Sequence, residues 1–347
     1  ADLEQEEASR VQATPKTEDL LTVDPLKIEL GYALIPLADP KQGGDLLARI
    51  QIIRQQTATK MGFIVPVIRV VDNMRLRPNE YRVRLREANI ASYELAADQF
   101  LAMNPGLVEE EIDGTPTKEP AFGLPAVWVN HHDRDRALRL GYTIVEPSAV
   151  LATHLTELVM AHADELLSRE DVQALIKHVK EKAPSVVEEL IPTHLTIGEL
   201  QKVLHNLLRE RVSIRNLEVI LETLADYAPR TRDTELLAEY CRHRLAREIC
   251  ASYVDEEDAL HVVTLEARLE QELLDALQRA ETGEYIPIDP RRADVIATNA
   301  LQAVQSLVIM GHEPIVLSSA SVRRYVKRII ERKQPRVVVL SYNEIDP

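Results

Sequence analysis

The sequence predicts a multidomain protein of the α/β plus α type, with mixed strand and helix patterns at both ends and helices alone in the middle. Strand-like alternation of apolar and polar residues recurs before residue 146, is missing from 148–249, and returns after residue 260. At 347 residues the chain is also too long for one ordinary hydrophobic core. We therefore expect an α/β first subdomain with an inserted small α/β subdomain, a central all-helical subdomain and a C-terminal α/β subdomain.

The first residues, 1–22, are polar and acidic and have no periodic apolar face. This composition is typical of a linker or arm. A short helix packed on a neighbour is the alternative. Ordered structure is expected to begin near Val23.

The first α/β subdomain is predicted at residues 23–92 plus 141–160. A strand is expected over 28–35, followed by a Gly-Gly turn and by apolar residues at helical spacing. The β-branched run 63–71 contains a proline, which favours an edge strand or a bulge. Residues 81–85 alternate with period two, as a half-buried strand does, so the overall pattern is β-α-β-β.

A second, smaller α/β subdomain is predicted at residues 93–140. Turn signals stand at 104–106 and 113–114, and an apolar stretch follows at 126–129. A further strand is expected at 142–145. We expect this strand to return to the first sheet, which would make the smaller subdomain an insertion.

The helical subdomain is predicted at residues 161–248. Capping-box signatures stand at Ser168, Thr196 and, more weakly, Ser213. Two successive apolar faces at helical spacing lie within 200–224. Short connections between these helices predict antiparallel neighbours in a small helical domain.

The C-terminal α/β subdomain is predicted at residues 249–347. A strand is expected at 261–265 and helices at 266–281 and 289–310. The last part, 315–340, has the pattern of a β-α-β unit, for which parallel pairing and a right-handed crossover are expected.

The predicted helix of this β-α-β unit carries a basic stripe, which consists of Arg323, Arg324, Lys327, Arg328 and Arg332. Valine and isoleucine residues form the opposite face. We interpret the segment as an amphipathic helix packed on a sheet with its basic face in solvent. A nucleic-acid surface is the alternative, but it needs a favourable overall field.

The net charge of −15 opposes that alternative, because it repels phosphate backbones and anionic lipid head groups. Protein partners are favoured, although an acidic balance is also common among soluble proteins. Cys241 and Cys250 are predicted to be buried structural thiols in a reducing compartment.

Motifs for catalysis are missing from the sequence. It has neither a P-loop nor a Gly-x-Ser-x-Gly elbow, and the adjacent His131, His132 and Asp133 would diverge rather than converge on a metal ion. No cofactor, no metal site and no enzymatic activity are therefore expected. An enzyme with an unrecognised site is the alternative, and a pocket with several strongly shifted pKa values would mark it.

Phe122 stands out, because it lies in a stretch, 119–125, with two prolines and one glycine, which is neither helix nor strand in pattern. A phenylalanine held there either anchors the loop to a core or lies at a surface pocket. The pattern alone leaves both interpretations open.

Several segments have a recognisable sequence: VDPLKIELGYALIP (23–36), VDNMRLRPNEY (71–81), PAFGLPAVW (120–128), ERVSIRN (210–216) and PRVVVLSYNE (335–344). Together with ATHL (152–155) and LQKVL (200–204), they resemble the cytoplasmic region of the FlhA family of flagellar export-gate proteins (FHIPEP, the type III export gate family). The resemblance covers about residues 23–347 in order.

This resemblance implies a docking platform of the flagellar type III protein export gate, which binds export chaperone–cargo complexes and helps to order and gate export. It implies an upstream membrane-spanning part, absent here, that anchors the protein at the cytoplasmic face of the bacterial inner membrane. It also implies assembly into a ring, by family analogy a nonamer. The implied partners are flagellar export chaperones with filament-type cargo, the ATPase complex and the export switch protein, and no nucleic acid. The export gate of a virulence injectisome is the alternative.

The resemblance further implies an apolar hollow for chaperones between the first two subdomains. Carried over position by position, its lining is Leu101, Met103, Pro105, Phe122, Leu124, Val145 and Val150, with Glu119 and Thr153 as polar contacts at its edge. An exposed apolar patch with a polar rim is the general signature of such a site.

Overall fold

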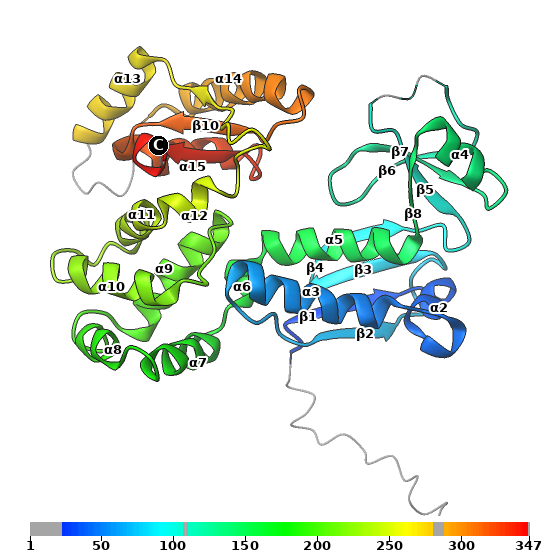
Figure 1. Cartoon of the computed structure of the whole chain (residues 1–347), viewed down its shortest axis with the longest axis horizontal. Helices are drawn as coiled ribbons and strands as arrows, with labels where there is room; N and C mark the ends of the chain where they lie inside the picture. The colour runs from blue at the N-terminus through cyan, green and yellow to red at the C-terminus, as the bar shows by residue number, and fades with distance from the viewer. Residues whose placement is uncertain (1–22, 107, 109, 280–287, 346–347) are drawn as a thin grey trace, which may run out of the picture. The chain divides into compact units, whose positions relative to one another are not determined.

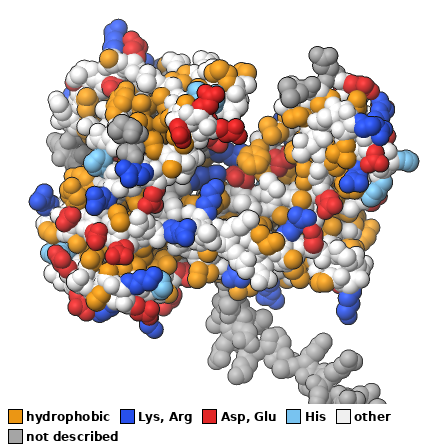
Figure 2. Space-filling view, viewed as in Figure 1, with side chains coloured by type: hydrophobic (Ala, Val, Ile, Leu, Met, Phe, Trp, Pro, Cys, Tyr) orange, Lys and Arg blue, Asp and Glu red, His pale blue; other side chains and the backbone are white. Residues whose placement is uncertain are grey.

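The computed structural model describes residues 23–106, 108, 110–279 and 288–345, and these divide into two compact units (Figure 1). Unit 1 contains the described residues up to 56 together with 65–159, and unit 2 contains 57–64 together with the described residues from 160 onward. The predicted arm, 1–22, lies outside the described residues. On the face shown in Figure 2, acidic and basic side chains are interspersed with apolar patches in both units.

The first sheet of unit 1 has the strand order β2-β1-β3-β4. Its strands are β1 (Leu26–Leu30), β2 (Ile68–Asp72), β3 (Glu80–Leu85) and β4 (Ala88–Glu94). β1 pairs with β2 in parallel and with β3 antiparallel. The helices α3 (Leu46–Met61) and α5 (Pro147–Ala161) cover one face of this sheet (Figure 1). The expected β-α-β-β order and the edge position of β2 are confirmed, although the strand expected within the run 63–71 begins only at Ile68.

The predicted strand over 28–35 was too long. β1 ends at Leu30, and the chain continues as the helical turns η2 (Tyr32–Leu34) and α2 (Ile35–Ala38), with η3 (Pro40–Gln42) after them. Gly31 marks the change, because a Cβ there would lie 2.2 Å from the carbonyl oxygen of Arg77. The apolar run therefore buries Leu34 from a helical turn rather than from a strand.

The second sheet of unit 1 has the strand order β6-β7-β5-β8. Its strands are β5 (Phe100–Met103), β6 (Thr115–Lys118), β7 (Pro125–Val129) and β8 (Thr143–Val145), and α4 (Arg134–Leu140) precedes β8. The expectation that 142–145 returns to the first sheet was wrong, because β8 pairs with β5 and places Leu101 opposite Val145. Tyr142 and Ile144 pack into the core of this second sheet, so the smaller subdomain extends past residue 140.

The middle of unit 2 is a group of short helices, as the pattern predicted. They are α6 (Ala163–Leu166), α7 (Arg169–Lys180), α8 (Pro184–Leu190), α9 (Ile197–Arg209), α10 (Leu217–Tyr227), α11 (Thr234–Arg244) and α12 (Ala246–Cys250). Capping boxes are present at Ser168 and Thr196. The weaker signal at Ser213 was wrong, because Asn216 is the N-cap of α10 and the Ser213 hydroxyl donates to the carbonyl oxygen of Lys60.

The C-terminal part of unit 2 has a parallel sheet with the order β11-β10-β9. Its elements are β9 (Val263–Thr264), α13 (Ala267–Gln278), α14 (Pro290–Ile309), β10 (Ile315–Ser318), α15 (Ala320–Glu331), β11 (Val338–Ser341) and η4 (Tyr342–Glu344). The predicted parallel β-α-β unit is confirmed, and the strand at 261–265 is shorter than expected. The last predicted residues of the helix 266–281, 280 and 281, lie outside the described residues.

The two cysteines are buried, as predicted. Burial raises the pKa of the Cys241 thiol to about 12, so this thiol is protonated and unreactive near neutral pH. Among the helices that the structure describes, none combines the length and the apolar character needed to cross a bilayer.

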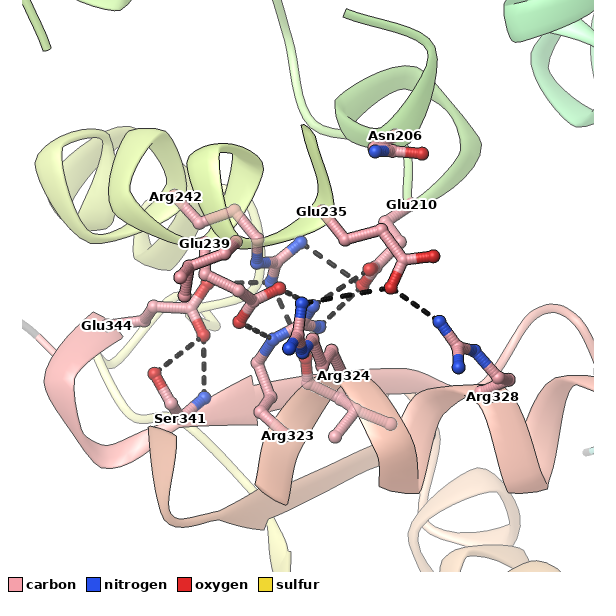
Figure 3. Close-up of polar contacts among 12 residues, drawn as sticks. Asn206, Glu210, Glu235, Glu239, Arg242, Arg323, Arg324, Arg328, Ser341 and Glu344 are labelled. Atoms are coloured by element: carbon pink, nitrogen blue, oxygen red, sulfur yellow. Dashed lines mark hydrogen bonds and ion pairs between the residues drawn. The ribbon is translucent and has the colours of Figure 1, made fainter. Parts of the chain in front are cut away.

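Most of the basic stripe of α15 does not lie in solvent as predicted, although Arg332, just after the helix, is exposed. Arg323 is fully buried and Lys327 is almost fully buried. The Arg323 guanidinium donates to both carboxylate oxygens of Glu210, at 2.6 and 2.9 Å, and to both oxygens of Glu239 (Figure 3). Arg242 lies beside it and forms an ion pair with Glu344 at 2.6 Å. We call Glu210, Glu239, Arg242, Arg323 and Glu344 the ion-pair cluster.

The ion-pair cluster links α15 and η4 to the helices α9 and α11 within unit 2. Further out along α15, Arg324 pairs with Asp233, and Arg328 pairs with Glu235. Because Arg323, Arg324 and Arg328 are engaged with carboxylates, this part of the stripe serves packing between helices. The alternative interpretation of the stripe as a nucleic-acid surface, which required these basic side chains to face solvent, therefore loses its basis.

Candidate functional site

The loop between β6 and β7, residues 119–124, holds Phe122 in a defined position. The Glu119 backbone N–H donates to the Leu124 carbonyl at 2.8 Å, and the Gly123 N–H donates to the Glu119 carbonyl at 2.9 Å. Gly123 has a φ of 73°, a left-handed conformation that favours glycine at this turn. The backbone bonds and the glycine together close a tight loop.

The Glu119 side chain fixes the same loop from inside. One carboxylate oxygen accepts the Ala121 N–H and the other accepts the Phe122 N–H, both at 2.7 Å. Hydrogen bonds to an ionised acceptor are about twice as strong as neutral ones. Phe122 remains half-exposed at 50%, and Leu124 is equally exposed at 52%. The loop therefore presents two large apolar side chains to solvent from a rigid backbone.

A chain of polar contacts connects this loop region to α5. The Tyr93 hydroxyl in β4 and the Thr117 hydroxyl in β6 are 3.0 Å apart, which links the two sheets of unit 1. The Tyr93 ring lies against Tyr81, with ring centroids 6.2 Å apart. The buried Tyr81 hydroxyl is 2.6 Å from Nδ1 of His154 in α5.

Glu119 also lies within electrostatic range of Tyr81. Burial raises the pKa of Tyr81 well above its ordinary value, and electrostatic interactions with Tyr93 and Glu119 add to this effect. His154 follows Thr153 directly and lies one helical turn after Val150. The Phe122 loop is thus connected, through Tyr81, to the turn of α5 that the resemblance assigned to the site.

The structure distributes the nine predicted site residues over three environments. The exposed ones are Pro105, Phe122, Leu124 and Thr153, the partly buried ones are Met103 and Val145, and the buried ones are Leu101, Glu119 and Val150. The buried residues cannot contact a partner in this conformation and can only support the surface. Glu119 in particular uses its carboxylate on the loop amides, and its predicted contact at the edge of the hollow remains a prediction.

Sequence reasoning missed the residues that support the loop, namely Tyr81, Tyr93, Thr117 and His154. Tyr81 lay in the predicted strand 81–85, where its alternation marks it as buried, but nothing in the pattern names its partner 73 residues away. A buried tyrosine in a strand is the one usable signal, because its hydroxyl requires a hydrogen-bond partner.

The chain belongs to the FHIPEP family, whose family profile matches residues 1–347. It is 44% identical to the Flagellar biosynthesis protein FlhA of Bacillus subtilis over 343 residues, which are 99% of this chain and 51% of that protein. It is 38% identical to the FlhA of Escherichia coli over 327 residues, 94% of this chain and 46% of that protein. The chain thus spans about half the length of these curated relatives.

Solved structures support the fold. The Chlamydia pneumoniae CdsV protein has a TM-score of 0.81 at 24% identity, with 94% of this chain and 95% of that chain covered. The nonameric EPEC SctV-C has a TM-score of 0.75 at 24% identity, with 94% and 96% covered. The mixed multidomain fold expected from the sequence is therefore confirmed.

Proposed function

We propose that this chain is a docking platform of the flagellar type III export gate, which binds export chaperone–cargo complexes and helps to order and gate their export. The observation that carries the proposal is Phe122, held half-exposed on a loop that Glu119 fixes. A preformed aromatic side chain loses little conformational freedom on binding, and aromatic anchors dominate the energy of many interfaces.

The surroundings of Phe122 suit an adaptable partner surface. Leu124 extends the exposed apolar area, and Met103, which is partly buried in β5, is a flexible apolar residue. Buried Leu101 lies opposite Val145 in the pairing of β5 and β8. We infer that a chaperone covers Phe122 and Leu124 and that Thr153 contributes at the edge.

The flagellar system is favoured over an injectisome, because the curated relatives at 38–44% identity are named as flagellar FlhA. We propose ring assembly for the protein, in analogy with the relative described as nonameric, and anchoring at the inner membrane through a part outside this chain. A complex of CdsV with CdsO in Chlamydia pneumoniae supports docking of further export proteins.

We also propose that the protein has no catalytic activity. The ionisable groups with the most strongly shifted pKa values that the structure describes include Glu210 and Arg323, which bind each other in the ion-pair cluster. Structural ion pairs shift pKa values as catalytic sites do, so such shifts alone do not indicate catalysis.

The test is calorimetric titration of a flagellar chaperone–cargo complex into the chain and its Phe122→Ala variant. We expect Phe122→Ala to weaken binding at least about tenfold, since truncation of a central anchor costs roughly 2 kcal/mol or more. The thermal unfolding midpoint should stay within about 2 °C of the parent, because the ring is half-exposed.

Leu138→Ala is the matched control, because Leu138 is similarly exposed (48%) but lies in α4, outside the predicted site. It should leave the affinity unchanged. If the parent and Phe122→Ala bind the chaperone–cargo complex with equal affinity, Phe122 is not part of the binding site and the proposal is wrong.

A further inference from the structure

Three side chains that commonly bind metal ions meet in the C-terminal part of unit 2. They are Asp255, His261 and His312, and one ligand atom from each lies within 4.8 Å of the others. Asp255 Oδ2 and His261 Nε2 are 2.9 Å apart. The rings of His261 and His312 lie face to face, with centroids 3.6 Å apart and planes inclined by 18°.

The carboxylate comes from a closed turn after α12. Oδ1 of Asp255 accepts the N–H groups of Glu257 and Ala259, both at 2.9 Å. The Asp255 N–H in turn donates to the Ala259 carbonyl at 3.0 Å. One carboxylate oxygen therefore holds the turn, while Oδ2 points to His261.

The two histidines are brought together by the parallel sheet. β9 and β10 pair in parallel, with Val263 opposite Val316, and each histidine lies a few residues before the amino end of its strand. The His312 N–H donates to the Leu307 carbonyl at 2.9 Å across Gly311, whose φ is 87°, so the end of α14 fixes the backbone there. The ligands thus come from three segments with separately fixed backbones.

We propose that Asp255, His261 and His312 bind one divalent transition-metal ion, with Zn²⁺ as the best match. Two imidazole nitrogens and one carboxylate favour zinc and its neighbours over magnesium or calcium, which prefer oxygen ligands alone. Ligands at about 2.1 Å in tetrahedral geometry lie roughly 3.4 Å from one another. The Asp255–His261 pair is already near that spacing.

Metal binding would require the stacked rings of His261 and His312 to tilt apart, so that a nitrogen lone pair of each points at one ion. All three side chains are partly exposed, so water supplies the remaining coordination. The ion would tie the turn after α12 to the end of α14 and stabilise the sheet at its amino edge.

The experiment is calorimetric titration of the chain, without any affinity tag, with ZnCl₂ and with MgCl₂. We expect one Zn²⁺ per chain and no heat of binding with Mg²⁺. The double variant His261→Gln/His312→Gln should lose this site, and His312→Gln alone should weaken it more than tenfold. A visible d–d absorption band with Co²⁺ in the parent, absent from the double variant, would identify the nitrogen ligands.

His178→Gln is the matched control, because His178 is an exposed histidine of α7 with a carboxylate, Glu181, at 3.9 Å. It should bind Zn²⁺ as the parent does. The inference is overturned if the parent binds no Zn²⁺, or if the folded double variant, checked by circular dichroism, binds it with the affinity of the parent.

Discussion

The Phe122 loop in unit 1 and the ion-pair cluster in unit 2 use carboxylates in opposite ways. Glu119 accepts two backbone N–H groups and thereby holds an apolar ring in solvent. Glu210 and Glu239 accept the N–H groups of Arg323 and thereby hold a charged group out of solvent. Transfer free energies favour phenylalanine in an apolar interior and arginine in water. Each arrangement therefore holds its side chain in the less favourable environment.

The difference indicates what each region is for. The Phe122 loop holds an aromatic side chain half-exposed on a backbone fixed by hydrogen bonds, and the proposed binding role rests on this arrangement. A buried, fully paired arginine contributes little net stability, but removal of one partner is costly, so it fixes how helices pack. Variants of the two regions should therefore separate binding from stability.

The largest expected effect comes from Arg323→Met. This change leaves Glu210 and Glu239 facing each other with one guanidinium fewer, and uncompensated buried charge costs about 3–5 kcal/mol. We expect the unfolding midpoint of unit 2 to fall by about 10 °C, as measured by calorimetry.

Arg332→Met is the control for this variant, because Arg332 is exposed just after the same helix. Its unfolding free energy should change by no more than about 0.5 kcal/mol. Equal midpoints for the two variants would mean that the cluster does not fix the packing of α15.

A smaller effect is expected on acidification. Burial alone would raise the pKa of Glu210, but the charges of Arg323 and Arg242 lower it to about 2. A carboxylate with a lowered folded-state pKa stabilises the fold above its unfolded pKa of about 4.3, and this contribution is lost as pH falls toward 2. The unfolding midpoint of unit 2 should therefore drop steeply between about pH 4.5 and pH 3.

The Arg323→Met variant sharpens this prediction. Without that guanidinium the pKa of Glu210 is lowered less, so the variant should show a shallower fall in the same pH window. Parallel curves for the parent and the variant would contradict the assignment of the acid sensitivity to this cluster.

The two regions also differ in how far the sequence predicts them. Local signals placed α15, its β-α-β unit and the Phe122 loop, because periodicity, prolines and glycines act over a few residues. The partners of Arg323 lie 113 and 84 residues away, so the sequence pattern placed Arg323 in solvent although it is buried. The pairing of β8 failed for the same reason, because alternation reveals a strand but not its neighbour. At the site, family resemblance named Phe122, and only coordinates revealed that Glu119 supports it.

Glu119→Ala is expected to affect stability less than Arg323→Met. It also tests most directly the difference between the Phe122 loop and the ion-pair cluster. The Ala121 and Phe122 N–H groups lose their acceptor, and these unmet hydrogen bonds should cost about 1–2 kcal/mol of stability. Binding of the chaperone–cargo complex should nevertheless weaken at least about fivefold, because the Phe122 ring must then be ordered on binding.

Hydrogen exchange should accelerate at the Ala121 and Phe122 amides of the Glu119→Ala variant. Glu111→Ala is the control, because Glu111 is an exposed carboxylate of the same subdomain, and it should change neither exchange nor affinity. Faster exchange with full affinity would show that the partner does not need a preformed ring, and the contrast drawn between a supported binding loop and a packing cluster would fail.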